Sequence, residues 1–169
     1  MQTHWIATWL LLAWLMPAEA AAQAMTVRLG AAAGTGLELA GGGGTAVRRS
    51  PTFVTVQAGV LLDNETRFEL GAALLMELEG RVGLAVEPQL RVNTPGRRWR
   101  GYFVAGTPIF VSPYTLFGVS VGPGMSFQLW RALLLFSELA LRVYPFGNDL
   151  PEGVVLFHAD LSLGVRYAF

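Results

Sequence analysis

The last fifteen residues, Val155 to Phe169, alternate almost without exception between apolar side chains and polar or small ones. Successive side chains of a β-strand point to opposite faces, so this segment predicts a strand with one apolar and one polar face. Strands in globular proteins usually run about 5–6 residues, whereas a tilted strand crosses a bilayer in about 9–11 residues. The length of the alternation therefore favours a membrane-spanning strand.

The composition is unusual for a soluble protein. Hydrophobic residues make up 53% of the chain and charged residues only 14%, against about 25% charged in typical soluble domains. The formal net charge is zero, so nothing points to a nucleic-acid partner. Cysteine is absent, which excludes disulfides and thiolate metal sites, and only two histidines are present. We expect neither a metal nor a cofactor.

Residues 1–24 have the pattern of a cleavable signal peptide. The apolar run from Trp5 to Met16 is shorter than the about 20 residues that a membrane-spanning helix needs. Two small-x-small sites follow, and we predict cleavage after Ala24. The segment before the run carries His4 but no Lys or Arg, so a membrane-anchor helix is the alternative. Cleavage would leave residues 25–169 as one barrel domain.

The alternation of the last segment recurs seven times upstream. The predicted strands are about 26–39, 53–62, 67–78, 82–92, 99–110, 116–127, 132–143 and the terminal one. Outside 99–110, the apolar positions carry no charged residue, and the charges fall on the opposite parity. A charge facing lipid near mid-membrane costs about 2–4 kcal/mol, which accounts for this segregation. A soluble β-sandwich or lipocalin-like barrel also alternates, with its apolar parity inside; the leader and the strand lengths favour the membrane.

Two features leave the strand details open. In segment 99–110 both parities contain apolar residues, and we expect Tyr102, Val104 and Phe110 to face outward because small residues fit more easily inside a narrow barrel. Pro88, Pro108 and Pro123 fall inside predicted strands. Proline removes a ladder donor, so we expect a bulge or one lost hydrogen bond at each.

An even number of strands places both termini on the periplasmic side. The turns at 63–66, 93–97 and 128–131 are then periplasmic, and the connections at 41–51, 79–81, 111–114 and 144–153 are extracellular. Aromatic residues gather near both ends, as in the interfacial girdles of transmembrane barrels. The predicted interfacial aromatics are Trp99 and Trp130 at the periplasmic end, and Tyr114 and Tyr144 at the outer end.

The inward parity is rich in ionisable groups. An eight-stranded barrel is just wide enough to be filled by side chains, and charges buried there must pair. We expect Glu87, Glu138, His158 and Asp160 near mid-barrel, within reach of arginines. The predicted lumen network is Glu69, Glu87, Arg91, Glu138, Arg142, His158, Asp160 and Arg166. Such a network predicts a largely sealed lumen; a narrow ion path in which His158 titrates is the alternative.

A catalytic triad on the terminal strand is excluded by its geometry. His158 and Ser162 lie on the same face, but four residues of strand separate them by about 13 Å. A nucleophile and its base must be within about 3 Å of each other. Asp160 could orient His158, and the serine would then have to come from another strand, such as Ser120 or Ser126. We expect no enzymatic activity.

Together these patterns predict an all-β fold: a closed, antiparallel, eight-stranded up-and-down transmembrane β-barrel after a signal peptide. The chain resembles the small bacterial outer-membrane β-barrels of the OmpA/OmpX type. The resemblance implies an outer-membrane location, a monomer, and contact with outer-membrane lipid and lipopolysaccharide. It also implies insertion by the barrel assembly machinery, with Tyr167 and Phe169 carrying the assembly signal. The expected role is structural or surface interaction; the alternatives are a narrow ion-conducting pore and a lipid-modifying enzyme.

Overall fold

A computed structural model describes residues 26–41, 46–62, 67–80, 82–148, 150–151 and 153–169. The predicted leader at 1–24 and the predicted turn at 63–66 lie outside these residues. Within them, no helix is long and apolar enough to cross a membrane. The regular elements are strands: β1 Val27–Gly41, β2 Ala46–Leu61, β3 Phe68–Glu77, β4 Leu84–Asn93, β5 Trp99–Gly106, β6 Ile109–Ser112, β7 Leu116–Gln128, β8 Leu133–Gly147 and β9 Val155–Ala168.

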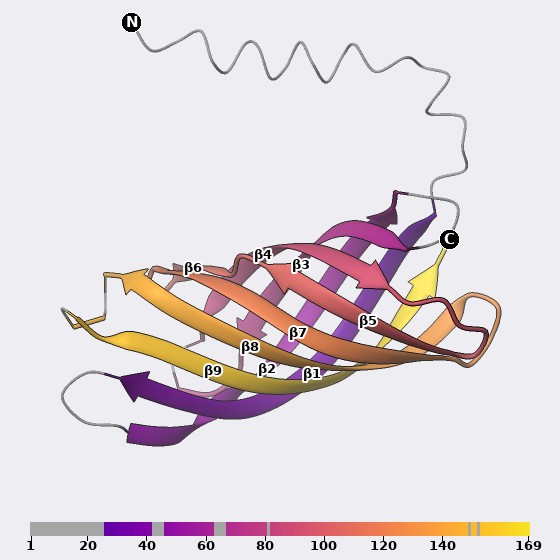
Figure 1. Cartoon of the computed structure of the whole chain (residues 1–169). Coiled ribbons are helices and arrows are strands. Elements are labelled where there is room, and N and C mark those ends of the chain that lie inside the picture. The colour runs from indigo at the N-terminus through magenta and orange to yellow at the C-terminus, as the bar shows by residue number, and fades with distance from the viewer. Residues whose placement is uncertain (1–25, 42–45, 63–66, 81, 149, 152) are drawn as a thin grey trace, which may run out of the picture.

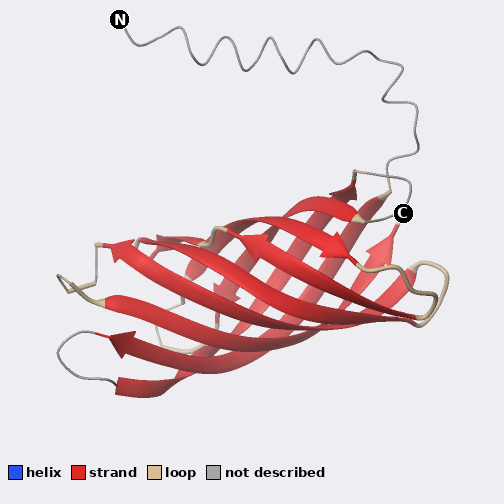
Figure 2. Ribbon diagram, in the orientation of Figure 1, coloured by secondary structure: helices blue, strands red, loops and turns tan. Residues whose placement is uncertain are grey.

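The strands close into a single antiparallel ring (Figure 1). Apart from β5 and β6, each strand pairs with its neighbours in sequence, and β1 pairs with β9 from Arg28↔Ala168 to Gly41↔Val155. Strands β5 and β6 both pair with β4 on one side and β7 on the other. β5 and β6 are therefore two parts of one interrupted strand, and the ring has eight strand positions. Figure 2 shows tilted strands around the whole barrel, which confirms the predicted fold class.

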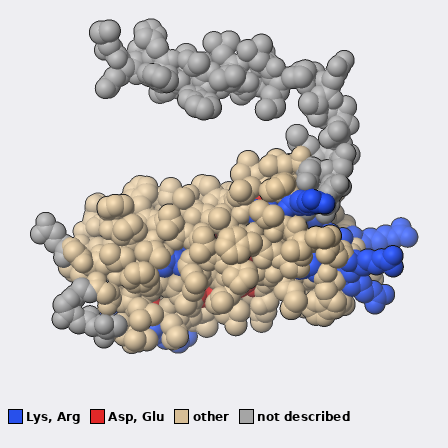
Figure 3. Space-filling model, in the orientation of Figure 1, with Lys and Arg blue, Asp and Glu red and all other residues tan. Residues whose placement is uncertain are grey.

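The outer surface of the barrel is apolar and the inner surface polar. Figure 3 shows a wall that is mostly free of charged atoms, with arginines gathered at one end. On β9, Leu161 and Leu163 are 53% and 61% exposed, whereas Asp160 and Ser162 between and beside them are 2% and 8% exposed. The same alternation runs along β3, β4, β7 and β8. This arrangement is the inverse of a soluble barrel and matches the lipid face of a transmembrane one.

The prediction for segment 99–110 was wrong. Tyr102, Val104 and Phe110 are only 4%, 2% and 2% exposed and face inward, while Phe103 is 49% exposed on the outside. The lumen accepts the Tyr102 ring because its register partner on β7 is Gly124. A Cβ atom at Gly124 would overlap that ring. The large inward ring of Tyr102 thus fits because the glycine opposite it on β7 has no side chain.

The three strand prolines do not shift the register. Pro88 pairs with Ala72, and Pro123 with Phe103, each within a continuous ladder. Pro108 lies in the break between β5 and β6, where the pairing with β4 is interrupted and then resumes in the same register. The register shifts instead occur between Gly34 and Gly36, Leu84 and Ala85, and Phe117 and Val119. No bulge is therefore found at these prolines, and the alternative of one lost hydrogen bond at each stays a prediction; the ladder between β7 and β8 passes from Val121 to Gly124 without pairing Pro123.

Two strands are longer than the alternation predicts. β1 and β2 remain paired as far as Ala40↔Ala46, so most of the connection predicted at 41–51 is strand. β8 continues to Gly147, so Tyr144 and Phe146 belong to a strand rather than to a loop. The register shift between β1 and β2 reverses which parity of β2 faces outward. The single uninterrupted alternation assumed for each strand could not follow such a change.

Candidate functional site in the barrel lumen

The part of the lumen nearest the termini holds a chain of ion pairs. Arg28 on β1 and Arg91 on β4 both contact Glu69 on β3, with N–O distances of 2.8 and 2.9 Å. The second nitrogen of Arg91 lies 3.2 Å from Glu138 on β8. All four side chains are at most 7% exposed. These ion pairs therefore connect inward-facing side chains of four different strands.

Arg166 completes this group from β9. It donates to the Gln57 side-chain oxygen at 2.9 Å, and its guanidinium lies 3.9 Å from Glu138. The same guanidinium stacks over Phe136 at 4.1 Å from the ring centre and lies 5.4 Å from that of Tyr102. Tyr102 donates its hydroxyl to Glu138 at 3.0 Å. Planar stacking and bidentate geometry both favour arginine over lysine in such a site.

A second ion-pair group lies further from the termini and is built around Arg142 on β8. Its guanidinium contacts Asp160 on β9 at 2.5 Å and Glu87 on β4 at 3.3 Å. Serine hydroxyls complete the two carboxylates: Ser50 donates to Asp160 at 2.8 Å, and Ser120 donates to Glu87 at 2.5 Å. Each buried carboxylate thus has an opposite charge and a hydrogen-bond donor.

Taken together, the two ion-pair groups contain as many arginines as carboxylates. Four arginines, namely Arg28, Arg91, Arg142 and Arg166, face four carboxylates, namely Glu69, Glu87, Glu138 and Asp160. Removing a charge from water costs several kcal/mol per ion, and only paired charges offset that cost. The structure brings together seven of the eight residues of the predicted lumen network. His158 is the exception, because it pairs with none of these arginines.

An apolar layer, which the sequence reasoning missed, fills the lumen beyond Arg142. Its buried members are Phe53, Leu75, Ala85, Phe110, Leu116 and Tyr144. Tyr144 is 1% exposed, and Tyr114 packs against the layer from the loop after β6. Both were predicted as interfacial aromatics, and the structure corrects this: their rings line the lumen. The parity of Leu75 with Glu69 and Glu77 was the signal that could have placed it inside.

His158 lies near the end of the lumen opposite the termini, which we call the far mouth, and not near mid-barrel as predicted. Its Nε2 atom is 3.7 Å from Oε2 of Glu38, its register partner on β1. A cavity of about 220 Å³ opens here, lined by Glu38, Pro51, Glu77, Phe110, Tyr114, Leu116, Leu150, Leu156 and His158. Tyr114 donates its hydroxyl to Glu77.

No catalytic arrangement is visible among the described residues. Asp160 accepts from Ser50 and Arg142 and so does not orient His158. Ser120 donates to Glu87 and Ser126 donates to the carbonyl of Arg100, so neither is activated by a histidine. Within the described ranges, no cluster of three or more His, Asp or Glu side chains could hold a metal ion.

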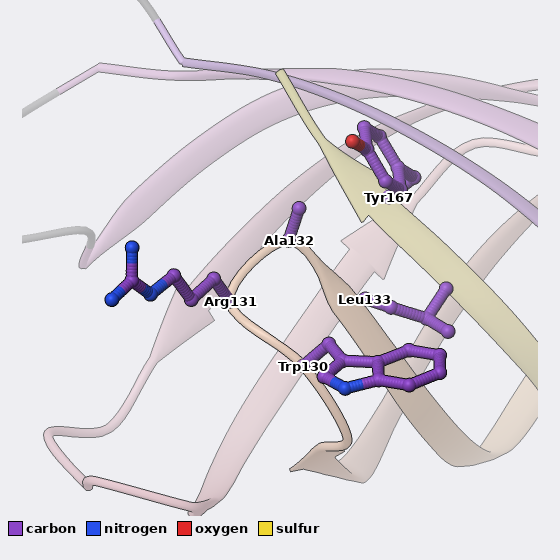
Figure 4. A pocket seen from close by; sticks show the side chains of 5 residues that line it. All are labelled: Trp130, Arg131, Ala132, Leu133 and Tyr167. Carbon is purple, nitrogen blue, oxygen red and sulfur yellow. The ribbon is translucent and has the colours of Figure 1, made fainter.

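The end of the barrel that carries the termini has exposed aromatic rings on its outer surface. Trp99 and Trp130 are 59% and 75% exposed, and Tyr167 and Phe169 are 47% and 68% exposed. The rings of Tyr167 and Phe169 meet edge to face at 4.8 Å. Figure 4 shows Trp130, Leu133 and Tyr167 around a shallow groove, with the Arg131 side chain pointing away from the rings.

Solved β-barrels of outer-membrane proteins have the same architecture. The N-terminal β-barrel domain of Pseudomonas aeruginosa OprF superposes with a TM-score of 0.62 at 16% identity, covering 85% of this chain and 97% of that one. Neisserial surface protein A gives 0.59 at 16% identity, covering 86% and 97%. No protein-family model and no curated protein sequence matches the chain. By its ring of strands and its apolar outer surface, the chain has the fold of the small eight-stranded outer-membrane β-barrels.

Proposed function

We propose that this protein is a non-catalytic outer-membrane barrel whose lumen is closed by its ion pairs, with a structural or surface-interaction role. One observation carries the proposal. Arg91 on β4 reaches Glu138 on β8, and Arg142 on β8 reaches Glu87 on β4. β4 and β8 are not neighbours in the ring, so both ion pairs bridge the lumen. Opening a water path here would require separating buried, balanced charges.

The outer surface supports the outer-membrane location. Leucine, valine and phenylalanine side chains cover the wall, with Leu135, Leu139 and Leu141 on β8 between 41% and 47% exposed. A water-soluble protein rarely exposes so continuous an apolar surface. The solved barrels of the same fold come from outer-membrane proteins. In this placement the wall contacts lipid, the loops of the far mouth face lipopolysaccharide, and Trp99 and Trp130 lie at the opposite interface.

The closed ring supports a monomeric state. Pairing of β1 with β9 leaves no free strand edge through which copies could join, which supports a monomer. Insertion would use the barrel assembly machinery. Tyr167 and Phe169, which project outward at the end of β9, would carry the recognition signal.

A planar-bilayer recording tests the closed lumen. Purified wild-type protein, folded and inserted, should give no reproducible unitary current. Reproducible conductance that changes in Glu138→Ala or His158→Ala, and not in the exposed control Glu79→Ala, would overturn the proposal in favour of a narrow pore. Altered lipid A acyl chains on expression, abolished by His158→Ala, would instead indicate a lipid-modifying enzyme.

A further inference from the structure

We infer that the far mouth of the lumen is a binding pocket for a small organic cation: an ammonium group on a short apolar body of about one ring. The pocket lies at the end of the barrel opposite the C-terminus in Figure 1. It is lined by two carboxylates, one imidazole and one phenol, with apolar side chains between them. This inference goes beyond the proposed function, since a closed barrel needs no ligand.

The two carboxylates of the pocket lie outside the balanced ion-pair groups. Glu77 is 5% exposed and accepts a hydrogen bond from the neutral hydroxyl of Tyr114. The Glu38 side chain is 25% exposed and faces His158. Arg48 is the register partner of Glu38 on β2, yet among the described residues no ion pair joins them. The pocket therefore concentrates negative charge that its own described side chains do not neutralise, and a cation would do so.

His158 supplies an unpartnered polar atom. Its side chain is 7% exposed, and Nε2 has no hydrogen-bond partner in the described structure. The 3.7 Å between Nε2 and Glu38 is too long for a hydrogen bond. Leaving such a group buried and unsatisfied is destabilising, and a donor from a ligand would remove that penalty. An ammonium group has three N–H donors and no acceptor, so it can serve a neutral imidazole nitrogen and carboxylate oxygens together.

Tyr114 keeps Glu77 available as an acceptor. Burial and the hydrogen bond to Glu77 raise the pKa of the Tyr114 hydroxyl, so it remains a neutral donor at physiological pH. It donates to Oε2 of Glu77, and no hydrogen bond from a described residue reaches the other carboxylate oxygen. Tyr114 also packs its ring against Phe110 at 5.1 Å between ring centres, which fixes the position of the donor.

The apolar lining sets the size of the ligand. Phe110, Leu116, Leu150 and Leu156 provide the walls beside the polar groups. The volume is about 220 Å³, and an apolar cavity of about 150 Å³ already holds benzene. Typical pockets for drug-sized ligands are about 300–1,000 Å³. The pocket therefore fits one aromatic ring or a short alkyl chain beside the charged group.

Ligand-observed NMR with phenethylamine as the probe tests the inference. The whole protein is folded in lipid nanodiscs, and empty nanodiscs correct for partition of the amine into lipid. We expect saturable binding to the wild type that weakens at least tenfold in Glu38→Gln and in Glu77→Gln. Glu79→Gln is the matched control, because Glu79 pairs with Arg49 outside the pocket and should leave binding unchanged. Heat-modifiable gel migration shows that each variant is folded.

One uncharged and one anionic comparison compound make the result decisive. 2-Phenylethanol has the same body without the cation and should bind at least tenfold more weakly, and phenylacetate should not bind. Equal binding of the alcohol and the amine, or binding that Glu38→Gln and Glu77→Gln leave unchanged, would overturn the inference. Absence of saturable amine binding to folded wild type would also overturn it. None of these outcomes affects the bilayer recording, so the inference of a cation pocket and the proposal of a closed lumen can be overturned independently.

Discussion

Arg142 on β8 and Asp160 on β9 form a buried ion pair, with 2.5 Å between Nη1 and Oδ2. The other nitrogen of Arg142 holds Glu87, so one guanidinium neutralises two carboxylates. Arg142→Met should destabilise the folded barrel by about 3–5 kcal/mol, because two buried carboxylates lose their counter-ion. Urea unfolding in lipid vesicles measures the change.

A triple variant separates charge from packing in that experiment. Arg142→Met combined with Asp160→Asn and Glu87→Gln removes the uncompensated charges and should recover most of the lost stability. The exposed Arg131→Met is the matched control and should leave the unfolding midpoint unchanged. If the triple variant is no more stable than Arg142→Met alone, the charge explanation fails and packing of the arginine stem is the cause.

Tyr102 and Gly124 should be energetically coupled. A methyl group at Gly124 meets the Tyr102 ring, so Gly124→Ala should cost about 1–3 kcal/mol by overpacking. In a Tyr102→Ala background the same substitution should cost much less. A double-mutant cycle on unfolding free energies measures the coupling, which is typically about 0.5–3 kcal/mol for residues in contact. Strict additivity would mean that the ring does not occupy the space left by the glycine.

A charge on the wall of the barrel should be costly in proportion to its depth. Leu141 lies near the middle of β8 and is 47% exposed. Leu141→Arg should cost about 2–4 kcal/mol in lipid, whereas Trp130→Arg at the end of the barrel should cost about 0–1 kcal/mol. Equilibrium folding into vesicles measures both. Equal costs at the two positions would contradict the membrane placement of the wall.

Loss of the terminal aromatic should affect assembly in cells more than stability. Phe169 is 68% exposed at the end of the chain and packs only against Tyr167 among the aromatic rings that we describe. Deleting Phe169 should lower the yield of folded protein in the outer membrane several-fold, while the purified chain still folds into vesicles. Phe157→Ala, on the same face of β9, is the control. A normal cellular yield without Phe169 would contradict its role as an assembly signal.

The alternation predicted the fold because both faces of a transmembrane strand are under strong constraint. Lipid excludes charge from one face, and the narrow lumen excludes unpaired charge from the other. Segment 99–110 has apolar residues on both parities, so the exclusion of charge from lipid does not decide which of its faces points outward. Tyr102 then faces inward because of Gly124, a residue of another strand. The outcome depends on a cross-strand pair that no single segment shows.

The sequence predicted which residues line the lumen better than it predicted which of those residues pair with each other. Parity places Arg91 and Glu138 on the inner face, but which charges meet depends on the stagger between strands. His158 shows this plainly: it lies opposite Arg142 on β8, yet the Arg142 guanidinium contacts Asp160 and Glu87, and His158 lies beside Glu38 instead. Tyr144 was misplaced because the predicted strand ended at residue 143, whereas β8 continues and Tyr144 keeps the inward parity of Glu138 and Arg142. The far-mouth pocket combines residues from several strands and loops, and so was not visible in any one of them.

Side-chain orientation on β9 tests the central claim that the apolar parity faces lipid. The chain has no cysteine, so single cysteines at Leu161, Ser162 and Leu163 can each carry one spin label. In lipid vesicles we predict that labels at Leu161 and Leu163 collide freely with molecular oxygen and poorly with a water-soluble nickel complex, while the label at Ser162 is protected from both. Labels at Leu161 and Leu163 that are protected from oxygen, or reached by the nickel complex, would contradict the inside-out barrel.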